Sequence, residues 1–303
     1  MSKVVGTTML IPKLQVLANL KEYMETQEVR IPKQVQWYDD RFYEFEFEEG
    51  RKEYFASVTT KLGIVNKPFL ARWRGDIGNR EADIKMSEAQ EKGTREHDAW
   101  ETLVKGGVVL FNPKKKPIYK QEDVDQYRLE YPKVSIIEEQ EEMHDIVKLS
   151  MFLERVKPVS LASEITVYSL INRDAGTMDN LFEIKEGEYL VSGSKPIFIP
   201  GGVYVADLKS GKSVDRSAYK QCACYANCVK EMGIADPIGT MVLHTSAATR
   251  SGIEGFSCIV RNKERMEQDY KSYRLTAALW EDENQDYHPK VFSLPTMVTY
   301  KHV

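Results

Sequence analysis

Cysteine is scarce in this sequence of 303 residues, and its four copies are poorly placed for cross-linking. Three crowd into one short segment and the fourth is distant: Cys222, Cys224, Cys228 and Cys258. This spacing argues against a disulfide framework and fits a reducing compartment. Three close cysteines plus a distant one could hold an iron–sulfur cluster. In a helix, however, Cys224 and Cys228 share a face while Cys222 points elsewhere, so we expect buried thiols without a ligand.

Long apolar runs and an excess of basic residues are also missing. A short apolar run at residues 9–11 is broken by Pro12, and no stretch approaches the length that crosses a bilayer. Lys and Arg number 42 and Asp and Glu number 46, which gives a net charge of −4. This balance excludes a protein that coats nucleic acid through bulk charge, although it permits a local basic groove. We expect a cytoplasmic protein without a membrane partner, from a bacterial, phage-infected or archaeal cell.

No linker rich in Gly, Ser or Pro divides the chain, so we expect one unit. Residues 1–56 would form an N-terminal arm, with a helix at 14–26 and a hairpin within 41–58. Residues 57–303 would form the main domain, with a helical region at 61–131 and a core at 160–282. In that core, β-rich runs such as 165–171 and 179–184 alternate with helices, which predicts an α/β fold with a mixed central sheet flanked by helices. The acidic stretch 138–145 would be a solvated helical face, and the segment 183–202 an extended hairpin.

Acidic residues at the ends of core strands are the first candidates for chemistry. Asp179 closes a short run, and Asp207 and Lys209 end an apolar strand. Carboxylates brought together by neighbouring strands would repel each other, and a Mg²⁺ or Mn²⁺ ion would relieve that repulsion. Because side chains alternate along a strand, Asp207 and Lys209 share one face, where the ammonium could orient a metal-bound water. A salt-bridged strand end without catalysis is the simpler alternative.

Four short motifs succeed one another along the chain. They are Gly93-Thr94-x-x-His97, Gly176-Thr177-x-Asp179, Asp207-x-Lys209 and Gln221-x-x-x-Tyr225. Their order resembles the nuclease signature of the RecB-type branch of the PD-(D/E)xK superfamily. The run Ser57-Val58-Thr59-Thr60, ahead of a long helix, resembles the opening of the mitochondrial genome-maintenance exonucleases and their phage relatives. The resemblance extends over residues 41–280.

The resemblance implies a restriction-endonuclease-like core and a metal-dependent DNA exonuclease. Such an enzyme would act on single strands or duplex ends in repair, recombination or genome processing. The resemblance also implies one or two Mg²⁺ or Mn²⁺ ions, held by His97, Asp179, Asp207 and the Leu208 carbonyl. Lys209 would be the catalytic lysine, and Glu164, just ahead of the first core strand, would be linked to the metal. Glu101, on the same helical face as His97, could add a carboxylate nearby.

Further residues would support the site or contact DNA. By the resemblance these are Gln221, Tyr225, Ser57 and Thr59. Arg72 and Arg74 join them because arginines suit phosphates and unstacked bases. The family often threads a single strand through an arch, which the region 61–131 would build.

The resemblance also bears on the cysteines and on the partners. RecB-like nucleases with an iron–sulfur cluster carry a cysteine ahead of the core, and this chain has none before Cys222. No cluster is therefore expected. DNA would be the main partner, and a recombination or replication protein would be a second one. A structure-specific endonuclease and a catalytically silent DNA-binding or assembly module are the alternatives.

Overall fold

The computed structural model describes residues 32–47, 50–191, 195–246 and 255–290, together with Gln15, Ala18, Asn19 and Glu22. The rest of the helix expected at 14–26 lies outside the described residues. The side chain of Asn19 donates a hydrogen bond to the Gly233 carbonyl at 3.0 Å, so this part of the arm touches the main domain. None of the described helices combines the length and the apolar character needed to cross a lipid bilayer.

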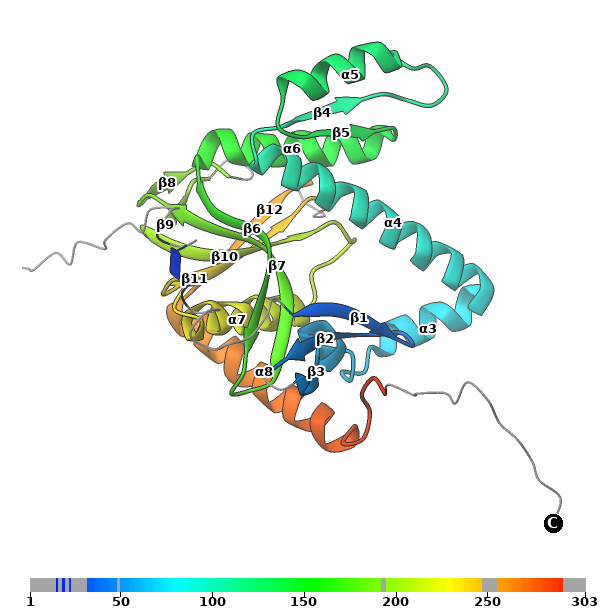
Figure 1. Ribbon diagram of the computed structural model, residues 1–303. Helices are drawn as coiled ribbons and strands as arrows, with labels where there is room; N and C mark the ends of the chain where they lie inside the picture. Colours follow the sequence, from blue (N-terminus) through cyan, green and yellow to red (C-terminus); the bar gives the residue numbers. More distant parts are fainter. Residues whose placement is uncertain are drawn as a thin grey trace, which may run out of the picture.

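A five-stranded sheet forms the centre of the molecule (Figure 1). In spatial order its strands are β12 (Ser257–Asn262), β11 (Gly239–His244), β10 (Gly202–Lys209), β7 (Asp174–Ile184) and β6 (Val159–Ser169). Strands β10 and β11 run parallel, and the other neighbours run antiparallel. The mixed central sheet predicted from the sequence is therefore confirmed.

Helices cover both faces of this sheet. Alternate residues of β10 point to opposite faces, and Val205 and Ala206 accordingly lie in different hydrophobic cores. The helices α7 (Arg216–Glu231) and α8 (Lys263–Glu283) pack on the face of Val205. The helices α4 (Asn79–Val104) and α6 (Gln140–Val156) pack on the face of Ala206. The predicted α/β class with helices on both sides of the sheet is thus confirmed.

The three clustered cysteines lie in α7 and are buried. Their side chains point to different partners, since the Cys222 thiol approaches the Met241 carbonyl and the Cys224 thiol approaches the Asp174 carboxylate. Burial raises the pKa of both thiols well above the usual range, which disfavours the reactive thiolate. The prediction of buried thiols is confirmed for these three, whereas Cys258 on β12 is partly exposed.

Two core strands are longer than the sequence predicts. The strands expected at 165–171 and 179–184 begin at Val159 and Asp174 instead. Glu164 and Asp179 therefore lie inside paired strands, and the expectation that they sit at strand ends is wrong. The segment 160–163 contains two serines, an alanine and only one large apolar residue, Leu161, without clear alternation, so its extended conformation comes from pairing with β7 rather than from local preference.

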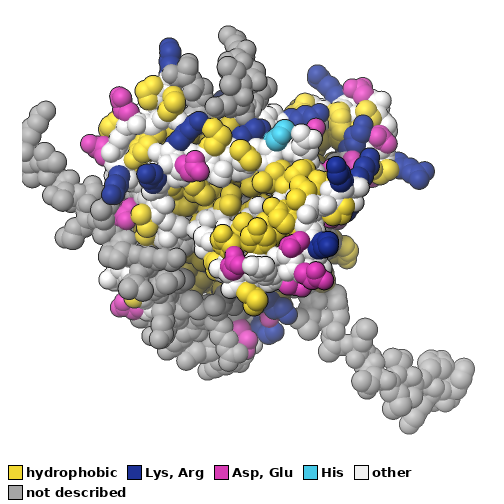
Figure 2. Space-filling model, turned by 90° about the horizontal axis from the view of Figure 1, so that it is seen from above, with side chains coloured by type: hydrophobic (Ala, Val, Ile, Leu, Met, Phe, Trp, Pro, Cys, Tyr) yellow, Lys and Arg dark blue, Asp and Glu magenta, His cyan; other side chains and the backbone are white. Residues whose placement is uncertain are grey.

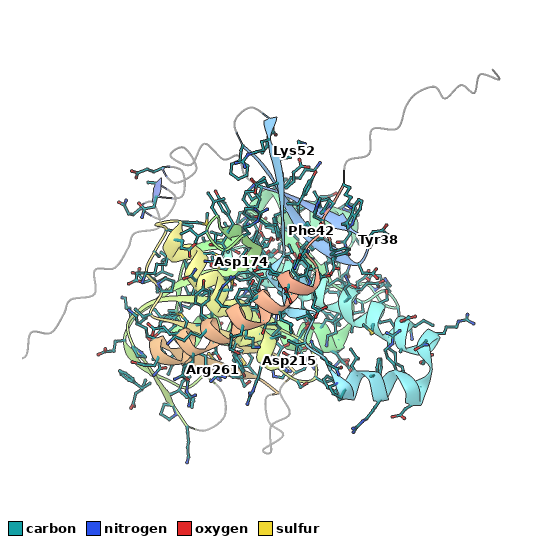
Figure 3. All side chains as sticks on the ribbon, turned by 90° about the horizontal axis from the view of Figure 1, so that it is seen from below. Tyr38, Phe42, Lys52, Asp174, Asp215 and Arg261 are labelled. Carbon is teal, nitrogen blue, oxygen red and sulfur yellow. The ribbon has the colours of Figure 1, made fainter. Side chains whose placement is uncertain are left out.

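A second, antiparallel sheet stands at the N-terminal side. It consists of β1 (Lys33–Trp37), β2 (Asp40–Glu46) and β3 (Lys52–Ala56), so the hairpin predicted within 41–58 is confirmed and gains one strand. The short helix α2 (Val58–Leu62) follows directly. Seen from below, this sheet lies beside α8, and the rings of Phe42 and Trp280 are 6.5 Å apart (Figure 3).

The region expected to be helical, 61–131, contains α3 (Pro68–Ile77), α4 and α5 (Gln121–Glu130), but also a strand. That strand, β4 (Val108–Phe111), pairs in parallel with β5 (Val134–Ile137), and α5 lies over the pair at the top of Figure 1. Four residues are too few for alternation to reveal a strand. The hairpin expected within 183–202 is confirmed by the pairing of β8 (Gly187–Tyr189) with β9 (Ile197–Ile199).

The acidic stretch 138–145 is a solvated face only in part, which corrects the prediction, because Glu139 and Glu141 are exposed but two other acids are buried. Glu142 and Asp145 of α6 are only 3% and 4% exposed. Arg95 pairs with Glu142 at 2.6 Å, and Lys92 pairs with Asp145 at 3.1 Å. Both cations come from α4, so these acids join the two helices instead of facing water.

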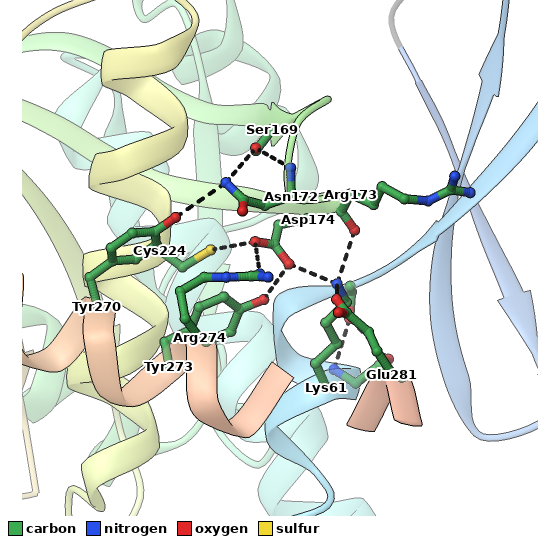
Figure 4. Close-up of polar contacts among 12 residues, drawn as sticks. Lys61, Ser169, Asn172, Arg173, Asp174, Cys224, Tyr270, Tyr273, Arg274 and Glu281 are labelled. Carbon is green, nitrogen blue, oxygen red and sulfur yellow. Dashed lines mark hydrogen bonds and ion pairs between the residues drawn. The ribbon is translucent and has the colours of Figure 1, made fainter. Parts of the chain in front are cut away.

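A buried network of charges fastens α8 to the rest of the fold (Figure 4). Its centre is Asp174, which is 1% exposed and begins β7. Lys61 of α2 pairs with Asp174 at 2.8 Å and with Glu281 at 2.6 Å. Tyr273 and Arg274 of α8 donate to the same aspartate at 2.7 and 3.1 Å. Every charge of this network has an opposite partner, which is the condition for burying it.

Candidate metal centre

Three carboxylates lie side by side across the central sheet. The register of the flanking pairs in β6 and β7 sets Glu164 opposite Asp179. The register of β7 and β10 sets Asp207 on the other side of Asp179. Cross-strand neighbours share one face of a sheet, so these acids come together from distant parts of the sequence. The backbone N–H of Leu208 donates to the Asp179 carboxylate at 2.8 Å, while the role expected for the Leu208 carbonyl stays a prediction.

A histidine completes a group that could hold a metal ion. One ligand atom each from His97, Glu164 and Asp179 lies within 4.8 Å of the others. His97 reaches this point from α4, and its Nδ1 is 3.5 Å from the Asp179 carboxylate. Imidazole and carboxylate ligands suit Mn²⁺ and other divalent cations, and a mainly carboxylate set also suits Mg²⁺. The metal site predicted around His97 and Asp179 therefore has suitable donors in place, with Glu164 as the third.

The backbone of Glu164 is unusual for a strand. Its φ angle is +53°, a left-handed value that non-glycine residues rarely adopt. Such a conformation costs on the order of 1–3 kcal/mol and commonly persists at functional sites. Burial and the nearby charge of Asp179 raise the pKa of Glu164 to about 7. A bound cation would favour the ionised form of this carboxyl group.

Asp207 lies beside the metal group and is held by its own partners. It is 2% exposed, and its carboxylate pairs with the Lys209 ammonium at 2.8 Å. Burial raises the pKa of Asp207 to about 6, although the charge of Lys209 opposes that shift. Burial also disfavours the charged form of Lys209, but Asp207 and Asp179 outweigh it and raise the pKa of the lysine above its usual range. The predicted pairing of Asp207 and Lys209 on one strand face is confirmed.

Gln221 and Tyr225 approach the site from α7, one helical turn apart. The Gln221 amide donates to the Asp207 carboxylate at 3.1 Å and accepts from Lys209 at 3.3 Å. The same amide nitrogen lies 3.4 Å from the Tyr225 hydroxyl. Gln221 therefore fixes the positions of both members of the ion pair. This contact agrees with the supporting role expected for it, while contact with DNA stays a prediction for both residues.

Ser57 caps the N-terminus of α2, and Thr59 lies in the first turn of that helix. The Ser57 hydroxyl accepts from the Thr60 backbone N–H at 3.0 Å and lies 2.9 Å from the Thr59 hydroxyl. Ser57 also bridges to Ala175 of β7, so the cap fixes α2 against the strand that carries Asp179. Its observed role is local support, and the DNA contacts predicted for this pair stay untested.

The predicted arginines and Glu101 lie outside the metal group. Arg72 is exposed on α3, and Arg74 pairs with Asp83 of α4 at 2.6 Å. The Glu101 carboxylate pairs with Lys133 at 2.6 Å and with Lys105, so its charge is already balanced. Glu101 is therefore not one of the grouped ligand residues, although its charge lies near enough to contribute to the raised pKa of Glu164.

Sequence reasoning missed the contribution of the N-terminal sheet. Tyr43 of β2 is 1% exposed, and its hydroxyl lies 3.0 Å from the Thr177 hydroxyl, two residues before Asp179. The alternation of β2 indicates that Tyr43 faces inward but not which strand it meets. This contact joins residues 134 positions apart, and no local pattern could have revealed it.

No protein-family model matches the chain, and no curated protein matches it.

Proposed function

We propose that the protein is a metal-dependent DNA exonuclease of the RecB-type PD-(D/E)xK kind, acting on single strands or duplex ends. The observation that carries this proposal is the meeting of His97, Glu164 and Asp179 beside the Asp207–Lys209 ion pair. Burial is the main cause of the raised pKa values of Glu164 and Asp207, and the charge of Asp179 adds to both shifts; a nearby divalent cation would oppose them. The donor set thus fits one or two Mg²⁺ or Mn²⁺ ions.

In this proposal different residues bind the metal, orient the attacking water and position the catalytic lysine. His97, Glu164 and Asp179 would hold the metal, with Asp207 beside them; the bound cation would supply charge that stabilises a phosphate and activates water. Because its pKa is raised, Lys209 is an ammonium at neutral pH. Lys209 would therefore act by orienting water and balancing phosphate charge, and it would not remove a proton. Gln221 would keep Lys209 aimed at the reacting phosphate.

The arrangement of the core supports a restriction-endonuclease-like fold as part of the proposal. Acidic residues on the antiparallel β7 and on β10, with β11 parallel to β10, fit the elements on which the resemblance would put them. The helix α7 follows β10 and carries Gln221 and Tyr225. The α/β class alone would not distinguish this fold from others.

We assign the arch of the proposed enzyme to α3 and the first half of α4. Lys67, just before α3, pairs with Asp215 at the start of α7 at 2.9 Å. At the other end, a Cβ atom on Gly93 would lie 3.7 Å from the Ser210 hydroxyl, directly after Lys209. Both ends of this span therefore meet the loop that leaves the proposed active site. The exposed Arg72 would contact the phosphates of a strand passing beneath it.

DNA is the substrate in this proposal, within a bacterial, phage-infected or archaeal cytoplasm. A partner protein of recombination or replication is also proposed. Apolar side chains gather on the face seen from above (Figure 2). The helix α6 also borders a groove of about 420 Å³, whose lining combines apolar residues such as Val147 and Met151 with the basic Lys148 and Arg155. Exposed apolar patches of this kind often bind other proteins.

The test is digestion of end-labelled single-stranded and duplex DNA with Mg²⁺, Mn²⁺ or EDTA. We expect nucleotides to be released from the ends only when a divalent metal is present, and a closed circular single strand to stay intact. Lys209→Ala should still bind DNA but lose about 100-fold or more in single-turnover rate. The matched control is Lys230→Ala, which removes an exposed lysine of α7 paired with Asp236 and should keep the wild-type rate.

Three outcomes would contradict parts of the proposal. Cleavage in EDTA would exclude the metal mechanism, and near-normal cleavage by Lys209→Ala would exclude the catalytic lysine. Opening of the circle would favour the structure-specific endonuclease. Binding without any product would favour the silent DNA-binding module.

A further inference from the structure

A chain of hydrogen bonds joins three elements directly beside the metal centre. The indole N–H of Trp100 on α4 donates to the side-chain oxygen of Asn180 on β7 at 2.5 Å. The side-chain nitrogen of the same asparagine donates to the Ser163 hydroxyl on β6 at 3.2 Å. One amide group therefore connects a helix to two strands, and we call Trp100, Asn180 and Ser163 the amide bridge.

Each member of the amide bridge is close in sequence to one of the three grouped metal ligands. In chain order the pairs are His97 with Trp100, Ser163 with Glu164, and Asp179 with Asn180. Residues three apart in a helix are neighbours, and the other two pairs are adjacent along a strand. The amide bridge thus connects the same three elements that supply the ligands, within one residue or one helical turn of each ligand.

The amide bridge is held firmly at its centre. Trp100 and Asn180 are each 1% exposed, so water is a poor substitute for their hydrogen-bond partners. The Trp100 ring also packs against Phe182 at 6.1 Å and Phe152 at 6.4 Å between ring centroids. An apolar contact here would also hold α4 on the sheet. Hydrogen bonds, however, have narrow preferred lengths and directions, so they fix the position of the helix more closely.

We propose that Asn180 is a positioning residue of the metal centre, which sets the spacing of the three ligands through Trp100 and Ser163. A metal site needs its ligands placed to within about 0.5 Å, and supporting contacts outside the ligands provide that accuracy. A shift of α4 relative to β7 would move His97 away from Asp179, whose carboxylate lies 3.5 Å from the imidazole Nδ1. This inference rests on the metal centre of the proposed function.

The test measures the Kd for Mn²⁺ by titration of the full chain, with the free ion followed by EPR. Asn180→Leu removes the amide and should raise this Kd about 10-fold, as for the loss of a contact that supports metal ligands. Ser163→Ala and Trp100→Phe each remove one hydrogen bond and should raise it about 3-fold. Trp100→Phe should add little to Asn180→Leu, because both changes break the same bridge. Ser163→Thr keeps the hydroxyl and should keep the wild-type Kd.

The matched control is Thr102→Val, which removes another buried hydroxyl of α4. Thr102 is fully buried, and its hydroxyl lies 2.6 Å from the Ser135 hydroxyl of β5, which is not a strand of the metal centre. The control should lower Tm without changing the Kd for Mn²⁺, whereas the bridge variants should change both. Thermal unfolding without metal shows which variants fold, and the two single-bond variants carry the test if Asn180→Leu does not fold.

The outcomes separate this inference from the proposals on which it rests. If the wild type binds Mn²⁺ and the folded bridge variants keep its Kd, the inference is overturned while the metal centre stands. An equal rise in Kd for Thr102→Val would also overturn it, because any loosening of α4 would then have the same effect. A wild type that binds no Mn²⁺ overturns the metal centre and the inference together. Mn²⁺ binding without DNA cleavage overturns only the nuclease function.

Discussion

Glu96, the residue before His97, is a buried carboxylate with little compensation. It is fully buried, and Lys92 of the same helix lies 3.4 Å away. Burial raises the pKa of Glu96 from its ordinary value of 4.5 to about 7, while the charge of Lys92 opposes the shift. The ionised form therefore reduces the stability of the folded protein at neutral and higher pH.

Replacing Glu96 with glutamine should change how stability depends on pH. A folded-state pKa above the unfolded value means that Glu96 favours folding below about pH 4.5, and that this advantage is lost as the pH rises through about 7. Glu96→Gln should therefore exceed the wild type in free energy of unfolding by about 1–3 kcal/mol at pH 8. The difference should shrink as the pH falls toward about 5.

Urea unfolding of both proteins at the two pH values measures this difference. Glu88→Gln, an exposed position of the same helix, is the control and should show no difference that varies with pH. If Glu96→Gln and the wild type differ in free energy of unfolding by the same amount at both pH values, the role assigned to the burial of Glu96 is contradicted.

At the scale of elements, the distance between α7 and β7 depends on one glycine. A Cβ atom on Gly176 would lie 2.4 Å from the Tyr225 hydroxyl, closer than any real contact. Tyr225 is 3% exposed and cannot move aside into solvent. The absence of a side chain at Gly176 lets α7 approach closely enough for Gln221 to reach Asp207.

Gly176→Ala should therefore push α7 away from the sheet. We expect a loss of about 1–3 kcal/mol in stability from overpacking. Under the proposed nuclease function, we also expect a fall in cleavage rate as Gln221 withdraws from the Asp207–Lys209 pair. Thermal unfolding and single-turnover cleavage measure the two effects. Gly75→Ala in α3 controls for stability, because no atom lies within 4 Å of the added methyl group, and it should be neutral or stabilising. Equal stability of the two variants would refute the steric argument.

At the scale of the whole molecule, the candidate metal centre joins residues of α4, β6 and β7, so an ion bound there should stabilise the complete fold. An ion present at about 100 times its Kd contributes about 2.7 kcal/mol. For a chain of this size we expect Mn²⁺ to raise Tm by several degrees. Asp179→Asn should lose this rise, because an amide is a poor substitute for a carboxylate ligand. Asp236→Asn, which changes an exposed acid elsewhere, should retain it. A rise of equal size in both variants would argue against the proposed ligands.

Much of the core could be predicted because its signals are local. The alternation of β10 indicated that Asp207 and Lys209 share a face, and helical spacing set Gln221 and Tyr225 one turn apart. The mixed sheet followed from the order of strands and helices. Each of these features depends on residues within a few positions of one another.

The features that the sequence did not predict share a physical cause, since each depends on a partner from elsewhere in the chain. Glu164 lies inside a strand because β7 pairs with the residues on both sides of it, although the segment 160–163 that precedes it gives no clear strand pattern. Glu142 and Asp145 are buried because α4 supplies Arg95 and Lys92. The Tyr43–Thr177 contact likewise joins two sheets that no periodicity relates.

The Asp174 network has a consequence for how the chain folds during synthesis. Lys61 bonds to Asp174 across 113 positions and to Glu281 across 220. Contacts of such long sequence separation form late, because large loops must close before the contacts can contribute. Before α8 has been made, Lys61 lacks its second partner Glu281, and Asp174 lacks the donors Tyr273 and Arg274. The nascent chain should therefore keep this part of the core open to water and to chaperones until α8 has been made.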